Sequence, residues 1–165
     1  LIEYQLHLRC HDPIWLSQTE NSTAISAPTA STGGMDFPMT FPIPFGSGVT
    51  GGNGNVTNAG NQIAWPVFIV QGPVSGPVIY NTPRGETLSF TSLTVATGDV
   101  LTVTTNPRTR AATVAGASVL GSLDYTAAKF PGISAASTES VGFYGVYGGY
   151  GASTSMTVTW RDSYL

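Results

Sequence analysis

Residues 100–115 read VLTVTTNPRTRAATVA, and this stretch predicts a β-hairpin. Apolar and polar residues alternate over 100–105, so that Leu101 and Val103 share one face of the strand while the threonines between them face the other way. Pro107 suits the second position of a turn that begins at Asn106. We therefore expect two antiparallel strands that are joined by a tight turn.

The same organisation extends along most of the chain. Short runs rich in Val, Thr and aromatic residues alternate with turn signals that contain Gly or Pro, and no helical pattern lies between them. Charged residues make up 9% of the chain, against the usual ~25%. These features predict an all-β sandwich over 46–165, with an N-terminal extended arm. The candidate strands are 55–58, 62–70, 77–81, 86–95, 100–105, 110–115, 118–124, 139–145 and 153–160.

The N-terminal part has a different composition. Residues 2–10 alternate as a half-buried strand does, and Asp12-Pro13 ends it. Residues 17–34, SQTENSTAISAPTASTGG, are small and polar, which is typical of a linker. The chain begins with Leu rather than Met, and we expect it to be a fragment of a longer protein or a processed chain.

Residues 36–45, DFPMTFPIPF, combine the pattern of a strand with three prolines. Because the prolines share one parity, their missing N–H donors lie along one edge, and such a strand can pair on its other edge only. Its apolar face needs burial, so we expect an arm that docks on this sandwich or on a neighbour's and forms an assembly interface. A polyproline ligand is disfavoured because no basic residue flanks the prolines. The interface residues are Phe37, Met39, Phe41, Ile43 and Phe45.

Several kinds of chemistry are disfavoured. His7 and His11 lie four residues apart, about 13 Å along a strand, whereas two ligands of one metal lie about 3–4 Å apart, so we expect no metal site there, although Cys10 and Asp12 are adjacent. No G-x-S-x-G elbow is present, and we expect neither an enzyme nor a cofactor. Net charge is −3 without a basic stripe, which argues against nucleic acid, and no apolar run approaches the ~20 residues of a membrane span.

Residues 141–153, VGFYGVYGGYGAS, place Tyr144, Tyr147 and Tyr150 at three-residue spacing among glycines. Exposed tyrosines can contact a partner protein or stack on a sugar. They can equally belong to a hairpin tip that covers the edge of the sandwich. The sequence leaves these three interpretations open.

Several motifs, taken in order, resemble the C-terminal part of siphovirus-type phage tail components, the distal tail (Dit-like) minor tail proteins. They are GMDFPMTFP (34–42), NAGN (58–61), WP (65–66), the hairpin, FPG (130–132) and TVTWRDSYL (157–165). The resemblance implies a galectin-like or jelly-roll sandwich that follows a ring-forming domain. On that basis 1–16 would be a strand that links to the ring domain, and 17–45 a connector with the proline-rich arm.

The resemblance also implies a structural role in the virion. Such a subunit would be made in the host cytoplasm and would contact copies of itself in a ring, such as a hexamer, at the tail tip. Other tail proteins, namely the tail tube and the baseplate or fibre proteins, would be its further partners. The alternative function is a lectin-like carbohydrate-binding module for the glycans of the host cell wall, since the fold alone does not imply one function. An exposed aromatic residue beside convergent polar groups, at the three tyrosines or at Trp65, would favour this alternative.

Overall fold

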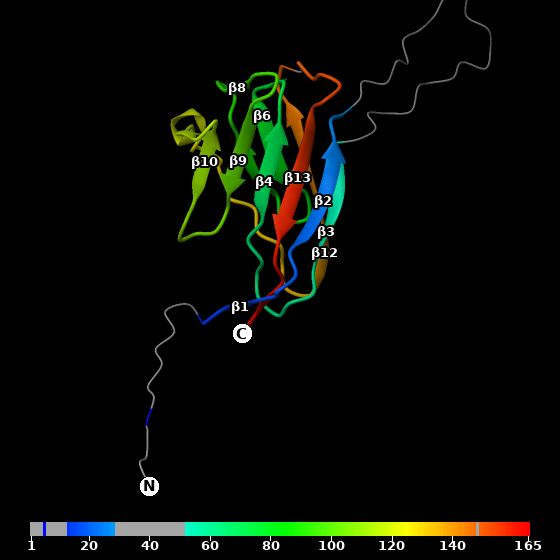
Figure 1. Ribbon diagram of the computed structural model, residues 1–165, viewed down its shortest axis with the longest axis vertical. Coiled ribbons are helices and arrows are strands. Elements are labelled where there is room, and N and C mark those ends of the chain that lie inside the picture. The colour runs from blue at the N-terminus through cyan, green and yellow to red at the C-terminus, as the bar shows by residue number, and fades with distance from the viewer. Residues whose placement is uncertain (1–4, 6–12, 29–51, 148) are drawn as a thin grey trace, which may run out of the picture.

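The structure is a computed structural model that describes residues 5, 13–28, 52–147 and 149–165 (Figure 1). Three predictions lie outside the described residues: the strand 2–10, the cluster of His7, Cys10, His11 and Asp12, and the apolar interface residues of 36–45.

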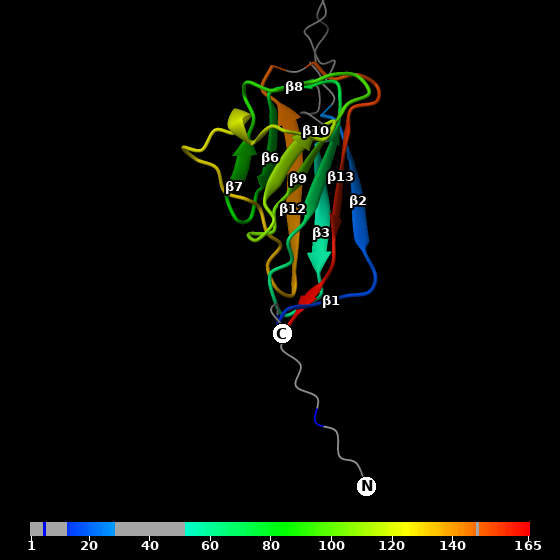
Figure 2. The same ribbon diagram turned by 60° about the vertical axis from the view of Figure 1, so that its left-hand side comes forward.

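Two antiparallel sheets pack face to face (Figures 1 and 2). The six-stranded sheet has the order β11-β10-β9-β4-β13-β2, which are Ala117–Ser118, Ala111–Val114, Val100–Thr104, Val67–Gln71, Ser155–Trp160 and Asn21–Ser26. The four-stranded sheet has the order β3-β12-β6-β7, which are Asn53–Asn58, Ser137–Gly145, Pro77–Asn81 and Glu86–Ser89. Two short ribbons pair β1 (Trp15–Leu16) with β14 (Ser163–Tyr164), and β5 (Val74–Ser75) with β8 (Thr94–Val95). The prediction of an all-β sandwich is confirmed.

Alternating side chains fill the space between the sheets. On β13, Met156 and Val158 are fully buried, whereas Thr157 and Thr159 point to the outer face of the six-stranded sheet. Phe68 of β4 and Phe143 of β12 contribute the largest fully buried side chains from opposite sheets. Because inward residues of both sheets belong to one hydrophobic cluster, the domain has a single core.

The predicted hairpin is confirmed as β9 and β10, whose register pairs Thr104 with Ala111. The N–H of Thr109 donates to the carbonyl of Asn106 at 3.0 Å, so Pro107 occupies the second position of the turn. Strand β9 ends one residue earlier than predicted. The buried hydroxyl of Thr105 donates instead to the carbonyl of Pro66 at 2.7 Å, which ties the hairpin to the segment that precedes β4.

The prediction of a connector over 17–45 is wrong for residues 21–26, which form β2 and pair along their whole length with β13. Ile25 of β2 is 2% exposed and belongs to the core. The outward residues Ser22, Ala24 and Ser26 are exposed, because β2 lies at the edge of its sheet. Small, polar side chains suit such an edge. Because they also resemble the composition of a linker, the strand was not predicted from the sequence. With β1 paired to β14, the sandwich therefore includes 15–26 and does not begin at residue 46.

Three predicted strands are shorter than expected. Strand β4 begins only at Val67, because Pro66 lacks the N–H that a central ladder uses. The run 86–95 is divided by a turn in which Leu93 N–H donates to the Phe90 carbonyl at 3.0 Å. The run 118–124 contains a single 3₁₀ turn, η1 (Leu120–Ser122), after the short strand β11.

The two ends of the segment 29–51 meet at one end of the sandwich. The N–H of Gly52 donates to the carbonyl of Ser26 at 2.9 Å. Gly52 has a φ of +76°, and a Cβ there would lie 2.8 Å from Cγ of Pro28, so this junction requires glycine. The chain thus leaves β2 and enters β3 at the same place, while β1, β14 and the C-terminus lie at the opposite end (Figure 1).

Candidate functional site

The three predicted tyrosines differ in their surroundings. Tyr144 lies on the outer face of the four-stranded sheet, with its ring centroid 5.9 Å from that of Tyr80. Tyr147 is 72% exposed in the turn after β12. Tyr150 packs against the core, and its hydroxyl accepts a hydrogen bond from Gly145 N–H, so its role is structural. Of the three, Tyr144 and Tyr147 are exposed, whereas Tyr144 and Tyr150 both lie near Tyr80.

Tyr80 and Tyr144 line a shallow basin with Thr82 and Thr87. The Tyr80 hydroxyl donates to Oδ1 of Asn53 across the sheet. Burial raises the pKa of Tyr80, and the neighbouring Tyr144 and Tyr150 raise it further. The basin is shallow, and two of its polar groups, the Tyr80 hydroxyl and Nδ2 of Asn81, are already used in hydrogen bonds within the fold.

A cluster of polar and charged side chains, which was not predicted from the sequence, is associated with the four-stranded sheet. Glu139 is 4% exposed, and its carboxylate accepts hydrogen bonds from Nδ2 of Asn81 and, at 2.9 Å, from Ser134 N–H. Arg84 forms a bidentate pair with Glu86 at 2.8 Å for both contacts. Arg84 also donates to the hydroxyl of Ser134 at 2.8 Å.

This cluster holds the Pro131–Ser134 loop in place. Nδ2 of Asn81 donates to the Gly132 carbonyl at 2.9 Å, and Gly132 N–H donates to Glu86 at 3.1 Å. Burial alone would raise the pKa of Glu139, but the hydrogen bonds from Asn81 and Ser134 and the charge of Arg84 outweigh burial and lower it. The carboxylates are therefore occupied by internal donors, and we interpret the cluster as structural.

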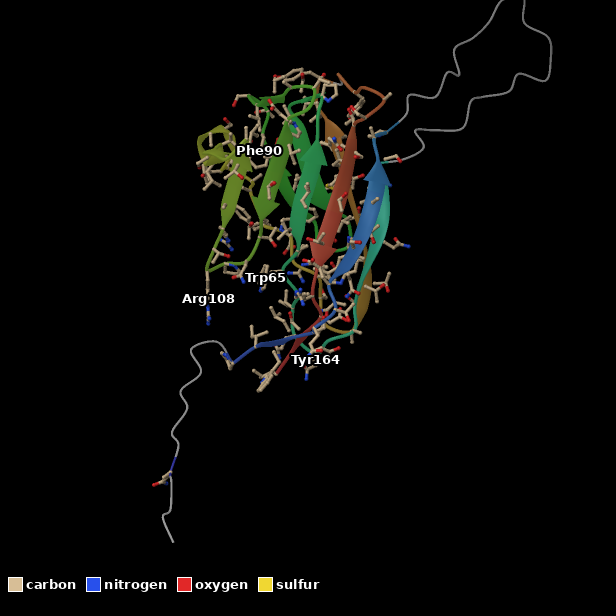
Figure 3. All side chains as sticks on the ribbon, in the orientation of Figure 1. Trp65, Phe90, Arg108 and Tyr164 are labelled. Atoms are coloured by element: carbon tan, nitrogen blue, oxygen red, sulfur yellow. The ribbon has the colours of Figure 1, made fainter. Side chains whose placement is uncertain are left out.

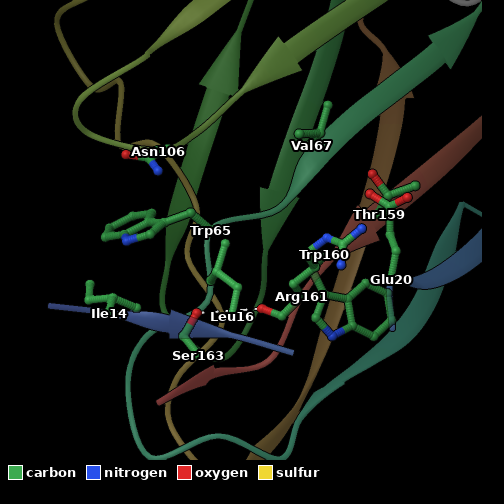
Figure 4. A pocket seen from close by; sticks show the side chains of 10 residues that line it. All are labelled: Ile14, Leu16, Glu20, Trp65, Val67, Asn106, Thr159, Trp160, Arg161 and Ser163. Atoms are coloured by element: carbon green, nitrogen blue, oxygen red, sulfur yellow. Dashed lines mark hydrogen bonds between the residues drawn. The ribbon is translucent and has the colours of Figure 1, made fainter. Parts of the chain in front are cut away.

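A groove lies at the lower end of the outer face of the six-stranded sheet (Figure 4). Its floor is formed by Val67 of β4 and Thr159 of β13, which are direct neighbours in register. Strand β1 borders the groove with Leu16, and Trp65 stands at one side, below Asn106 in the figure. The volume of the groove is about 200 Å³. Figure 3 places Trp65 and Tyr164 toward this same end of the sandwich.

The indole of Trp65 is held firmly although it is only half-buried. A Cβ at Gly132 would lie 3.1 Å from Cζ3 of this indole and 2.8 Å from Cγ2 of Ile63. Glycine at 132 therefore lets one edge of the ring pack against the loop, and the polar cluster fixes that loop. The remaining part of the ring lines the groove.

The polar side chains of the groove come from several segments. Arg161 follows β13 and donates to the carbonyl of Ser17 at 2.9 Å and to that of Gln18, which fixes the β1–β2 connection. The side chains of Glu20, Thr159 and Trp65 make no hydrogen bond with the residues that the structure describes. Of the residues that line the groove, only Trp65 could be named as a site candidate from the sequence. The alternation of apolar and polar residues over 155–161 indicates that Thr159 and Arg161 face outward, and this pattern could have identified them.

Two of the motifs that carry the resemblance, NAGN (58–61) and TVTWRDSYL (157–165), meet beside this groove. Asn58 is fully buried, and its Nδ2 donates to the carbonyls of Gln62 at 2.7 Å and Ser134 at 3.1 Å. A Cβ at Gly60 would lie 1.9 Å from the carbonyl oxygen of Ser163. The NAGN segment therefore packs directly against the C-terminal strand β14. Leu165 N–H donates to Oδ1 of Asn61 at 2.8 Å.

Within the described part of the chain, no group of three or more His, Cys, Asp or Glu side chains could hold a metal ion. The same residues include no helix that is long and apolar enough to cross a membrane. Comparison with protein-family models, with curated proteins and with solved structures gave no match.

Proposed function

We propose that the chain is a structural subunit of a siphovirus-type phage tail, a minor tail protein of the distal tail type. It would assemble with copies of itself at the tail tip, between the tail tube and the baseplate or fibre proteins. The support is the order of the motifs in the sequence, together with their roles in the fold. Asn58 and Gly60 close the sandwich, Gly132 braces Trp65, and the C-terminal motif forms β13 and β14.

One observation carries this proposal furthest. The hydrogen bond from Gly52 to Ser26 brings both ends of the segment 29–51 to the same point at one end of the sandwich. That segment contains the alternating apolar residues Phe37 to Phe45, which have the pattern of a one-sided strand. Because β2 ends and β3 begins at the same place, the segment between them could extend to a neighbouring copy without disturbing either strand. This arrangement suits subunits that interlock.

The proposal predicts that the full chain self-associates and that Phe41→Asp abolishes the association. A charge placed on the apolar face would have to be desolvated in the interface, which costs several kcal/mol. Thr40→Asp is the matched control, because residue 40 has the opposite parity and lies outside the apolar set. Sedimentation velocity over a range of concentrations measures both. A chain that stays monomeric at every concentration, or equal effects of the two substitutions, would contradict the proposal.

The alternative of a lectin-like module has weaker support at Tyr144, Tyr147 and Tyr150, because Tyr150 packs against the core and its hydroxyl accepts a hydrogen bond from Gly145 N–H. One observation favours it, namely the groove that places Trp65 beside Thr159, Glu20 and Arg161. A binding site for glycans is also compatible with a tail protein.

A further inference from the structure

The groove offers an aromatic surface that is fixed before any ligand arrives. Trp65 packs one edge against Gly132, and the Pro131–Ser134 loop beneath it is held by hydrogen bonds to Asn81 and Glu86. A ring that is already ordered loses little conformational entropy on binding. The exposed face of an indole can stack on the C–H face of a pyranose ring, and its N–H remains available as a donor.

The groove also presents hydrogen-bonding groups that the fold does not use. The hydroxyl of Thr159 and the carboxylate of Glu20 form no hydrogen bond with any described residue, and they stand across the groove from Trp65 (Figure 4). A hydroxyl both donates and accepts, whereas a carboxylate only accepts. A ligand with several adjacent hydroxyl groups, each a donor and an acceptor, can satisfy both.

Charge and size narrow the class of ligand. Glu20 and Arg161 carry opposite charges, and Arg161 already donates to two backbone carbonyls, so the groove has no strong preference for an anion or a cation. Pockets for drug-sized ligands have volumes of roughly 300–1,000 Å³. A volume of about 200 Å³ suits a smaller group, of the size of one sugar ring.

We propose that this groove binds a neutral saccharide, with one pyranose ring stacked on Trp65 and its hydroxyl groups bonded to Thr159 and Glu20. This inference does not depend on the proposed tail function, since it concerns the opposite end of the sandwich from the 29–51 junction. A failure of saccharide binding therefore leaves the self-association test unaffected, and the reverse also holds.

The test is a titration of the full chain with methyl glucosides, methyl galactosides, lactose, cellobiose and soluble arabinogalactan. Amide NMR shifts and tryptophan fluorescence report binding. Concentrations up to about 20 mM fill about 95% of a site whose Kd is ~1 mM. We expect at least one saccharide to shift the resonances of residues that line the groove. Trp65→Ala should weaken this binding at least about tenfold, and Thr159→Val about fivefold to tenfold, because each removes a direct contact.

Two matched controls distinguish the groove from the rest of the surface. Thr157→Val changes the neighbouring outward residue of β13, which lies two positions before Thr159 and does not line the groove. Trp15→Phe changes a tryptophan of β1 that is 76% exposed and lies outside the groove. Both should bind as the unchanged chain does. The inference is overturned if no saccharide binds, if the controls weaken binding as much as Thr159→Val does, or if Trp65→Ala instead removes self-association, which would identify the occupant as a second copy.

Discussion

A chain that begins at residue 29 is expected to lose the cooperative thermal unfolding transition of the full chain. The deletion removes β1 and β2, and with β2 it removes the whole partner of one edge of β13. Burial of Ile25 alone contributes about 1.5–3 kcal/mol, and the exposed edge and core add to this loss. The free energy of unfolding of a domain is about 5–15 kcal/mol in total, so this deletion removes a large part of it.

The contrasting change replaces 29–51 with a short Gly-Ser linker and should preserve the transition. The carbonyl of Ser26 and the N–H of Gly52 are already hydrogen-bonded, so a short linker can span the gap. Loop closure favours the shorter connection by only about 1–2 kcal/mol. Circular dichroism melts of both chains test the domain boundary directly. If the chain that begins at residue 29 melts like the full chain, then β2 does not belong to the sandwich.

Glu139→Gln is expected to lower the free energy of unfolding at pH 7 by roughly 1–3 kcal/mol. The carboxylate accepts from both Asn81 and Ser134, whereas a glutamine amide has one acceptor oxygen, so one buried donor loses its partner. Glu139→Ala should cost more, because it also leaves a cavity. Urea unfolding measures both. Ser140→Ala is the control, since residue 140 is the next position of β12 and lies outside this network.

The pH dependence of this effect has a definite sign. The folded pKa of Glu139 is lowered below its usual value of 4.5, so its ionisation stabilises the fold fully above that pH. The stabilisation is lost as the pH falls through the folded pKa. The difference in stability between the unchanged chain and Glu139→Gln should therefore narrow below about pH 4.5. A difference that stays constant down to pH 3 would contradict this assignment.

Much of the fold could be predicted from the sequence, because inward and outward residues differ in character on the central strands. The alternation of Leu101 and Val103 with threonines identified β9, and Asn106-Pro107 placed its turn. Strand β2 escaped detection for a physical reason. It lies at an edge, so that only Ile25 needs to be strongly apolar, and the remaining residues have the composition of a linker.

Most residues of the groove could not be predicted from the sequence. Trp65 could be named as a candidate because an exposed aromatic residue beside polar groups is typical of a sugar site, but Glu20, Thr159 and Arg161 are ordinary polar residues until the fold brings them to one place. The buried cluster of Glu139, Asn81 and Arg84 was missed for the same reason. Its members belong to two separate segments, 81–84 and β12, and their pairing depends on the register of β12 with β6.

We propose above that this chain is a structural component of a phage tail. Immunogold electron microscopy of purified virions, with antibodies raised against the sandwich, tests it most directly. We expect gold at a single place on each particle, the tip of the tail distal to the head. Virions that remain unlabelled while the protein is abundant in the lysate would contradict the claim, as would label along the full length of the tail or on the head.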